Sequence, residues 1–272
     1  MLRFLQSTGI FYVCDFITEK QKGSGYYIIK EANKNTEKKG DTAMKKKAGK
    51  KLYSVFEIYG IAVKAFRSAS DLKKLRKSGV LTEKMQERVM LAVTSVNKCS
   101  MCSYAHTEAA LKAGLDDSEI KSFVESDFPN VPEEESKAVM FGQYYAEKRG
   151  KIDKDVYDEL VSSYGKELSK GILASARIIM LGNAMGIVFG SVSGRIHGRG
   201  GDSRSSILYE VAVIITLLPI MIFASLQALL LNILRVPKIS FKKKRKTNVK
   251  HCFMRFVFFP KSETDIKKPS VF

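Results

Sequence analysis

Residues 99–106 read CSMCSYAH: two cysteines stand three positions apart, and a histidine follows four positions after the second. Residues three or four positions apart share one face of a helix, so Cys99, Cys102 and His106 are expected to form one stripe. The N-terminus of a helix stabilises a thiolate, the reactive form of cysteine. We expect Asn97 to cap this helix, with Cys99 in its first turn and His106 as acceptor of a thiol proton.

A carboxylate partner for this histidine is available in Glu87, which lies twelve residues before Cys99. In one continuous helix these two residues would be ~18 Å apart. A turn near Asn97–Lys98 would instead pack two helices side by side, so that Glu87 orients the His106 imidazole and keeps it basic. The candidate catalytic residues are therefore Cys102, Cys99, His106 and Glu87.

Other uses of a cysteine pair stay open at this point. A structural zinc site needs four ligands, and the motif supplies three. The fourth would have to come from a distant position, namely Cys14, Cys252, His197 or His251. Haem attachment of the c type needs a histidine directly after the second cysteine, where Ser103 stands. A purely structural pair of core cysteines is the third alternative. We expect no bound metal or cofactor.

The sequence around the motif has a helical pattern. Apolar residues recur at spacings of three and four from Leu52 to Phe66, with Phe56 on the expected apolar stripe. Thr82 is a suitable cap for a helix over about 83–96. Further helices are expected over about 99–113, from 116, over 132–150, from 153, and over 168–192. No clean period-two run occurs, so the predicted fold class is all-α.

Val211–Leu234 is an uncharged segment of 24 residues, dominated by aliphatic side chains. At ~1.5 Å per residue it spans ~36 Å, enough for a hydrocarbon core of ~30 Å, and Pro219 is tolerated inside a membrane helix. We expect a C-terminal transmembrane helix. A core helix of a soluble oligomer and a helix lying in the membrane interface are the alternatives. The glycine-containing run Ile178–Gly194 is expected to be a packed domain helix.

The net charge of +18 is concentrated at the two ends of the chain. Residues 1–51 hold 12 Lys/Arg against 5 Asp/Glu, and residues 235–272 hold 12 against 2. Basic ends beside an apolar segment favour contact with anionic lipid, and we expect no nucleic-acid partner. The expected organisation is a basic, disordered extension (1–50, with Met44 as a possible alternative start), a helical redox domain (51–200), a membrane segment (207–234) and a basic tail (235–272).

Three stretches together resemble a known family: ERVMLAV (87–93), CSMCSYAH (99–106) and AALKAGL (109–115). They resemble the core of the carboxymuconolactone decarboxylase superfamily. Within it, the spacing Glu-x11-Cys-x2-Cys-x3-His resembles the AhpD-like alkylhydroperoxidases, and the resemblance covers about Leu52 to Arg149. It implies an all-helical fold that assembles as a homo-oligomer.

The resemblance also implies a mechanism. Cys102 would attack a peroxide after His106, relayed by Glu87 through a water, removes its proton. Cys99 would then resolve the sulfenic acid to a disulfide. An external dithiol, a lipoyl group or a thioredoxin-like protein, would reduce that disulfide. The chain departs from the pattern at Met101, where the best-known peroxidases have a second histidine, and in its apolar segment and basic tail.

The sequence thus predicts a thiol-dependent peroxidase or disulfide oxidoreductase at the cell membrane. The rule that positive flanks stay inside would place the basic tail in the cytoplasm and the domain outside. The dithiol needs reductant and no signal peptide is recognisable, so we expect a cytoplasmic catalytic domain. The alternatives are a non-catalytic membrane-associated redox sensor or scaffold, and a decarboxylase-like activity.

Overall fold

The computed structural model describes residues 51–125 and 130–241, and every regular element in them is an α-helix. The all-α prediction is therefore confirmed for this part of the chain. The helices are α4 (Val55–Lys77), α5 (Glu83–Asn97), α6 (Ser100–Lys112), α7 (Asp117–Glu125), α8 (Glu133–Glu147), α9 (Lys154–Ile196) and α10 (Ile207–Ile233). Outside the described residues lie the expected N-terminal extension with Met44, the tail beyond Phe241, and three of the distant metal-ligand candidates: Cys14, His251 and Cys252.

Local sequence explains where the helices begin and end. The hydroxyl of Thr82 accepts a hydrogen bond from the Met85 amide at 3.1 Å and starts α5. Gly114 follows α6 with φ 85°, a left-handed value that suits glycine. Pro132 precedes the acidic first turn of α8. The predicted apolar stripe of α4 was wrong at Phe56, whose side chain is 89% exposed.

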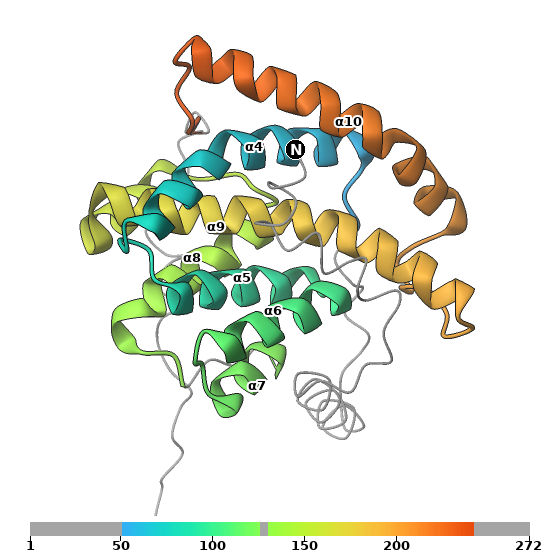
Figure 1. The fold of residues 1–272 in the computed structure, drawn as a ribbon, viewed down its shortest axis with the longest axis horizontal. Coiled ribbons are helices and arrows are strands. Elements are labelled where there is room, and N and C mark those ends of the chain that lie inside the picture. Colours follow the sequence, from blue (N-terminus) through green and yellow to red (C-terminus); the bar gives the residue numbers. More distant parts are fainter. Residues whose placement is uncertain (1–50, 126–129, 242–272) are drawn as a thin grey trace, which may run out of the picture. The chain divides into compact units, whose positions relative to one another are not determined.

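Helix α9 crosses the centre of the fold and packs against α4, α5, α6 and α8 (Figure 1). Its 43 residues join the two helical segments that the sequence predicts from 153 and over 168–192. They meet at Gly165, where φ 72° and ψ 168° break the helical path. Of the most apolar 18-residue stretch of α9, 89% is buried inside the fold. The run Ile178–Gly194 is thus a packed domain helix, as predicted.

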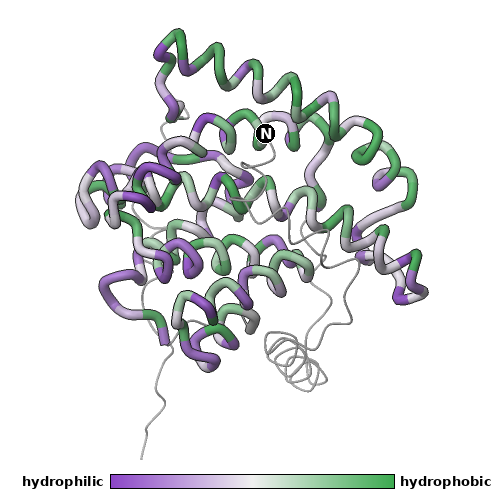
Figure 2. Tube along the Cα trace, viewed as in Figure 1, coloured by the Kyte–Doolittle hydropathy of each residue, from purple (hydrophilic) through white to green (hydrophobic). Residues whose placement is uncertain are grey.

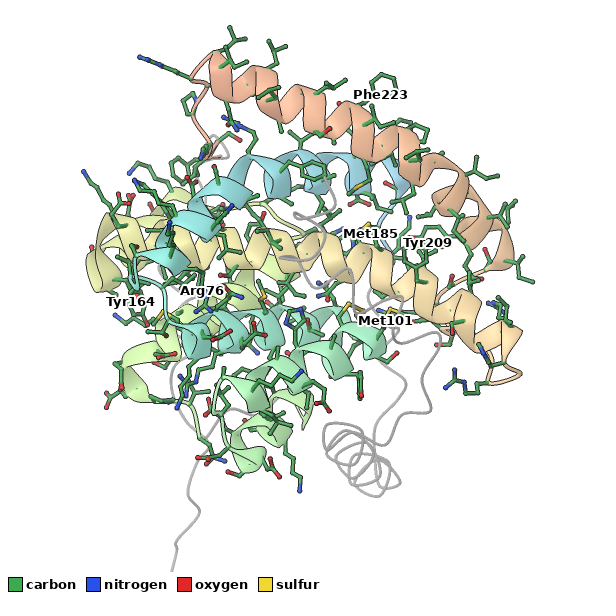
Figure 3. The ribbon with its side chains drawn as sticks, in the orientation of Figure 1. Arg76, Met101, Tyr164, Met185, Tyr209 and Phe223 are labelled. Carbon is green, nitrogen blue, oxygen red and sulfur yellow. A yellow bond between two sulfur atoms is a disulfide. The ribbon has the colours of Figure 1, made fainter. Side chains whose placement is uncertain are left out.

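Helix α10 lies along α4, on the opposite side of α4 from α5 and α6 (Figure 1). Most of its length is apolar (Figure 2). Only 28% of its most apolar 18-residue stretch is buried inside the fold. Phe223, labelled in Figure 3, is 62% exposed on its outer face. By length and composition, α9 and α10 are both able to cross a membrane.

Arg149 ties the beginning of α4 to the end of α8. Its guanidinium donates to the carboxylate of Glu57 at 2.9 Å and to the backbone carbonyls of Lys51 and Leu52. It also stacks over the ring of Tyr53, with 4.3 Å between the guanidinium carbon and the ring centroid. The hydrogen bond from Arg149 lowers the pKa of Glu57 to about 2.

We predict that Glu57→Gln lowers the free energy of unfolding at neutral pH and that this difference disappears in acid. Because the folded pKa lies below the unfolded one, ionised Glu57 stabilises the fold above pH ~4.5. That contribution is lost as the pH falls through about 2. Urea denaturation of both proteins between pH 7 and pH 2 measures the difference. Glu147→Gln, on the exposed end of α8, is the control. A Glu57 effect of equal size at all pH values would contradict the assignment.

Candidate functional site

A sharp reversal between α5 and α6 positions the candidate residues. Lys98 adopts φ 56° and ψ 47°, the left-handed conformation, and ends α5. Arg204, from the loop before α10, donates to the carbonyls of Asn97 at 3.0 Å and Lys98 at 3.2 Å. The same guanidinium binds Asp202 and holds the pKa of that carboxyl below its usual range. The loop before α10 therefore braces the turn that precedes Cys99.

This reversal brings Glu87 of α5 to His106 of α6. Glu87 Oε2 lies 2.7 Å from His106 Nδ1, and Gln86 donates to the other carboxylate oxygen at 3.1 Å. The Glu87 side chain is buried, so few competing water contacts weaken the pair. When Nδ1–H keeps its proton and donates a hydrogen bond to the carboxylate, the neutral imidazole has its lone pair on Nε2, and this nitrogen can act as a base.

Cys99 and Cys102 form a disulfide at the start of α6, with their Cα atoms 5.3 Å apart. Cys99 is the N-cap of the helix, and its sulfur accepts a hydrogen bond from the Cys102 amide at 3.3 Å. Cys102 thus stands in the first helical turn, where unpaired amides and the helix dipole favour a thiolate. Cys102 is 8% exposed and Cys99 is 1% exposed.

The prediction that Asn97 caps this helix is wrong. Asn97 is the last residue of α5, and its side chain is held inside the core. Its carbonyl oxygen accepts from the Tyr53 hydroxyl at 2.7 Å, and its amide lies 3.5 Å from the sulfur of Met180. Two residues separate it from the first helical turn, because the left-handed Lys98 intervenes. The cysteine side chain takes the capping role instead.

The two sulfur atoms pack against bare backbone of α9. A Cβ atom built on Gly186 would lie 2.5 Å from the Cys102 sulfur and 2.8 Å from the Cys99 sulfur. The Cys102 sulfur also lies 3.5 Å from the carbonyl oxygen of Gly182, one turn earlier. A Cβ atom built on the next glycine of this face, Gly190, would lie 3.8 Å from Met101 Cβ, an ordinary contact distance (Met101 is labelled in Figure 3). Any side chain at position 186 would therefore clash with both sulfur atoms, so this position requires glycine.

Sequence reasoning missed these α9 glycines and Arg204 as parts of the site. The signal for the glycines was present, because Gly182, Gly186 and Gly190 recur every four residues and so share one helix face. No comparable local pattern singled out Arg204, which reaches the motif from about a hundred residues away in the chain.

The zinc alternative gains no ligand from the described residues. His197, at the end of α9, makes a hydrogen bond through Nδ1 to the Ser193 carbonyl at 2.8 Å. Within residues 51–125 and 130–241, no group of three or more His, Cys, Asp or Glu side chains is placed to hold a metal ion.

The comparison with known families falls on this same part of the chain. Residues 63–130 match the carboxymuconolactone decarboxylase family. The matched segment contains Glu87, both cysteines of the motif and His106, and it ends before α8. The superfamily resemblance inferred from the motif is thereby confirmed for this segment. No curated protein and no solved structure gives a significant match to the chain.

We predict that Gly186→Ala destabilises the oxidised protein by about 1–3 kcal/mol, the usual cost of overpacking a core. The added methyl group would force the sulfur atoms away from α9. Gly190→Ala is the matched control, because its nearest contact would be 3.8 Å. Alanine is also the better helix former there. Denaturant unfolding under oxidising conditions compares the two variants, and equal stabilities would contradict the contact.

Proposed function

We propose that this chain is a thiol-dependent peroxidase whose reactive centre is the Cys99–Cys102 pair with His106 and Glu87. The observation that carries the proposal is the 2.7 Å contact between Glu87 and His106, beside a disulfide in the first turn of the same helix. A buried carboxylate on an imidazole near a redox-active cysteine is the usual arrangement for activating a thiol. The family match supports the superfamily level of this assignment.

The proposed reaction begins with the reduced pair. His106 Nε2 accepts the Cys102 thiol proton, with a water as carrier, and the thiolate attacks the terminal oxygen of the peroxide. The O–O bond breaks, the leaving alkoxide takes up the proton to become an alcohol, and Cys102 becomes a sulfenic acid. Cys99 then attacks the Cys102 sulfur, an S–S bond forms and water leaves. An external dithiol, lipoyl or thioredoxin-like, returns two electrons and restores both thiols.

The surroundings of the two sulfurs support unequal roles. Cys102 is the more exposed of the two and lies one helical turn from His106. Cys99 is nearly inaccessible, and its sulfur accepts the Cys102 amide. A buried resolving thiol meets the sulfenic acid inside the fold, whereas the attacking thiol must meet substrate. We therefore propose Cys102 as attacking and Cys99 as resolving residue.

We predict that Cys102→Ser abolishes consumption of cumene hydroperoxide with dihydrolipoamide as reductant. Cys99→Ser should allow one stoichiometric reaction and leave a sulfenic acid on Cys102 that a dimedone probe captures. His106→Ala should slow this first step by ~10²–10⁴-fold, and Glu87→Gln by less, because Glu87 acts through His106. Stopped-flow kinetics and mass spectrometry provide the readouts.

The same experiment separates the peroxidase from a redox sensor. The brace from Arg204 to the turn before Cys99 favours the sensor as second candidate, because it links the disulfide to the loop that begins α10. A sensor would form the disulfide without repeated turnover. Retained turnover in both cysteine variants would remove peroxide chemistry from this site altogether.

We further propose that α10 attaches the protein to a lipid surface. Its inner face is fastened to the domain by one contact near its start and two near its end. Tyr59 donates to Gln227 at 2.6 Å, Arg67 to Asn232 at 3.3 Å, and Arg195 to the buried Glu210 at 3.1 Å. Its outer face is a continuous set of exposed apolar side chains, among them Leu208, Ile215, Leu218, Phe223, Leu226, Leu230 and Ile233.

A helix docked on a domain along its length favours an orientation in the membrane plane over one that crosses it. The sequence that follows α10 is strongly basic, which favours an anionic lipid surface. A helix in the membrane plane does not carry the chain across the bilayer, so this arrangement agrees with a cytoplasmic domain. A second copy of this chain carries the same strong positive charge after α10, which disfavours it as the partner of this face. We therefore favour lipid as the occupant and expect any homo-oligomer to use another surface.

We predict that replacing Ile222, Phe223 and Leu226 by glutamine weakens vesicle binding at least about tenfold, because three apolar side chains lose their burial in lipid. Flotation with anionic vesicles measures the effect. Val80→Gln, an exposed apolar position between α4 and α5, is the control. If the triple variant binds vesicles normally but changes its sedimentation from oligomer to monomer, the face is an oligomer interface instead.

A further inference from the structure

A second feature lies away from the redox motif: a cleft of about 440 Å³ bounded by α4, α9 and the segment that follows α10. Its polar lining comes from all three elements, namely Ser68, Asp71, Lys170, Arg177 and Lys238. The volume is in the range of sites for small molecules. Nothing in the proposed redox chemistry uses these residues.

Arg177 is the unusual member of this lining, because it is 4% exposed and its terminal nitrogens donate to neutral oxygens rather than to a carboxylate. One terminal nitrogen donates to the Ser68 hydroxyl at 2.9 Å, and the other donates to the Lys238 carbonyl at 2.8 Å. Within the described chain, its Nε atom has no hydrogen-bond partner. A buried guanidinium is costly unless a counter-charge accompanies it.

The neighbouring side chains add further positive charge around Arg177. Burial lowers the pKa of Lys64 and of Arg67, and the positive charge of Arg177 lowers both further. Two carboxylates face the region, and each is engaged with a lysine. Asp71 binds Lys238 at 2.7 Å, and the exposed Glu167 binds Lys170 at 2.5 Å. The three remaining cations, Lys64, Arg67 and Arg177, have no carboxylate to balance them among these contacts.

A purely structural role for Arg177 would be to fasten the segment after α10. That segment already has such a fastening, because Arg67 donates to the carbonyls of Val236 at 2.5 Å and Pro237 at 3.2 Å. A structural role also leaves the Nε donor unsatisfied, whereas an anion in the cleft would supply an acceptor.

We propose that this cleft binds a phosphate group, carried either by a soluble phosphorylated molecule or by a lipid headgroup. A guanidinium fork together with ammonium groups is the usual protein surrounding of phosphate oxygens. The bound anion would neutralise the excess positive charge around Arg177 and accept from its free donor. The site is independent of the redox centre, so its test does not depend on peroxide activity.

Calorimetric titration of inorganic phosphate into the full chain in detergent tests the site. Wild-type protein should bind phosphate saturably, and Arg177→Gln should weaken binding at least about tenfold, since a charge-assisted donor is lost. Lys170→Gln, on the rim, should weaken it less. Lys166→Gln is the control. Like Lys170, Lys166 is an exposed cation on the same helix, but it lies outside the cleft, so its loss should change affinity less than about twofold.

If Arg177→Gln fails to fold, a second variant tests the phosphate site. Asp71→Asn removes the carboxylate from the cleft and frees Lys238, so it should bind phosphate about threefold more tightly or better. Impaired folding cannot produce such a gain. No saturable binding by the wild-type chain, or no gain with Asp71→Asn, would overturn the proposal.

Vesicles distinguish the two sources of phosphate. Flotation is compared on phosphatidylcholine vesicles with and without phosphatidic acid, for Arg177→Gln and Lys166→Gln. A headgroup site predicts that phosphatidic acid strengthens binding and that Arg177→Gln alone loses this gain. A site for a soluble molecule predicts an unchanged gain in both variants, while Arg177→Gln still loses inorganic phosphate. If Arg177→Gln behaves as Lys166→Gln in both assays, Arg177 is structural only and the site is refuted.

Discussion

Lys98 takes up a left-handed conformation that costs an ordinary residue roughly 1–2 kcal/mol. Its amide bonds back to Thr94 at 2.8 Å, and Arg204 binds the carbonyls on either side of the reversal, so these contacts offset the cost. Without this reversal α5 and α6 would run on as one helix. Glu87 would then lie far from His106, and Cys99 would be an interior helical residue rather than a cap. The geometry of the candidate site follows from this one turn.

The second requirement is the central helix. α9 contacts α4, α5, α6 and α8, so its small residues determine how closely the other helices approach. At Gly186 this approach allows both sulfur atoms to rest on the helix backbone. The same helix also carries Arg177, which lines the cleft beside α4. Nine residues along one helix therefore separate a contact of the redox pair from the buried guanidinium, a rise of ~14 Å.

The sequence predicted those features of the fold that depend on residues close together in the chain. The three-and-four spacing predicted helices, and Thr82, Gly114 and Pro132 marked their ends as the structure has them. The pairing of Glu87 with His106 was predicted because a turn between their two helices is the only way to bring the side chains together. The cap of α6 was misassigned because an asparagine is the commoner capping residue and the left-handed Lys98 has no sequence signature. Phe56 was misplaced because a spacing rule does not tell which end of an apolar stripe is covered.

Non-local determinants were out of reach. Arg204, Gly182 and Gly186 reach the cysteines only through tertiary packing. The four-residue spacing of the glycines places them on one helix face, but it does not show which side chains they meet. Their arrangement gives the redox pair a wall of peptide backbone on the α9 side. Methionine and cysteine side chains beside a centre that handles oxidants are themselves open to oxidation. A glycine wall has no side chain to be modified, so this surface would keep its shape through repeated turnover if the cysteine pair reduces peroxides as proposed.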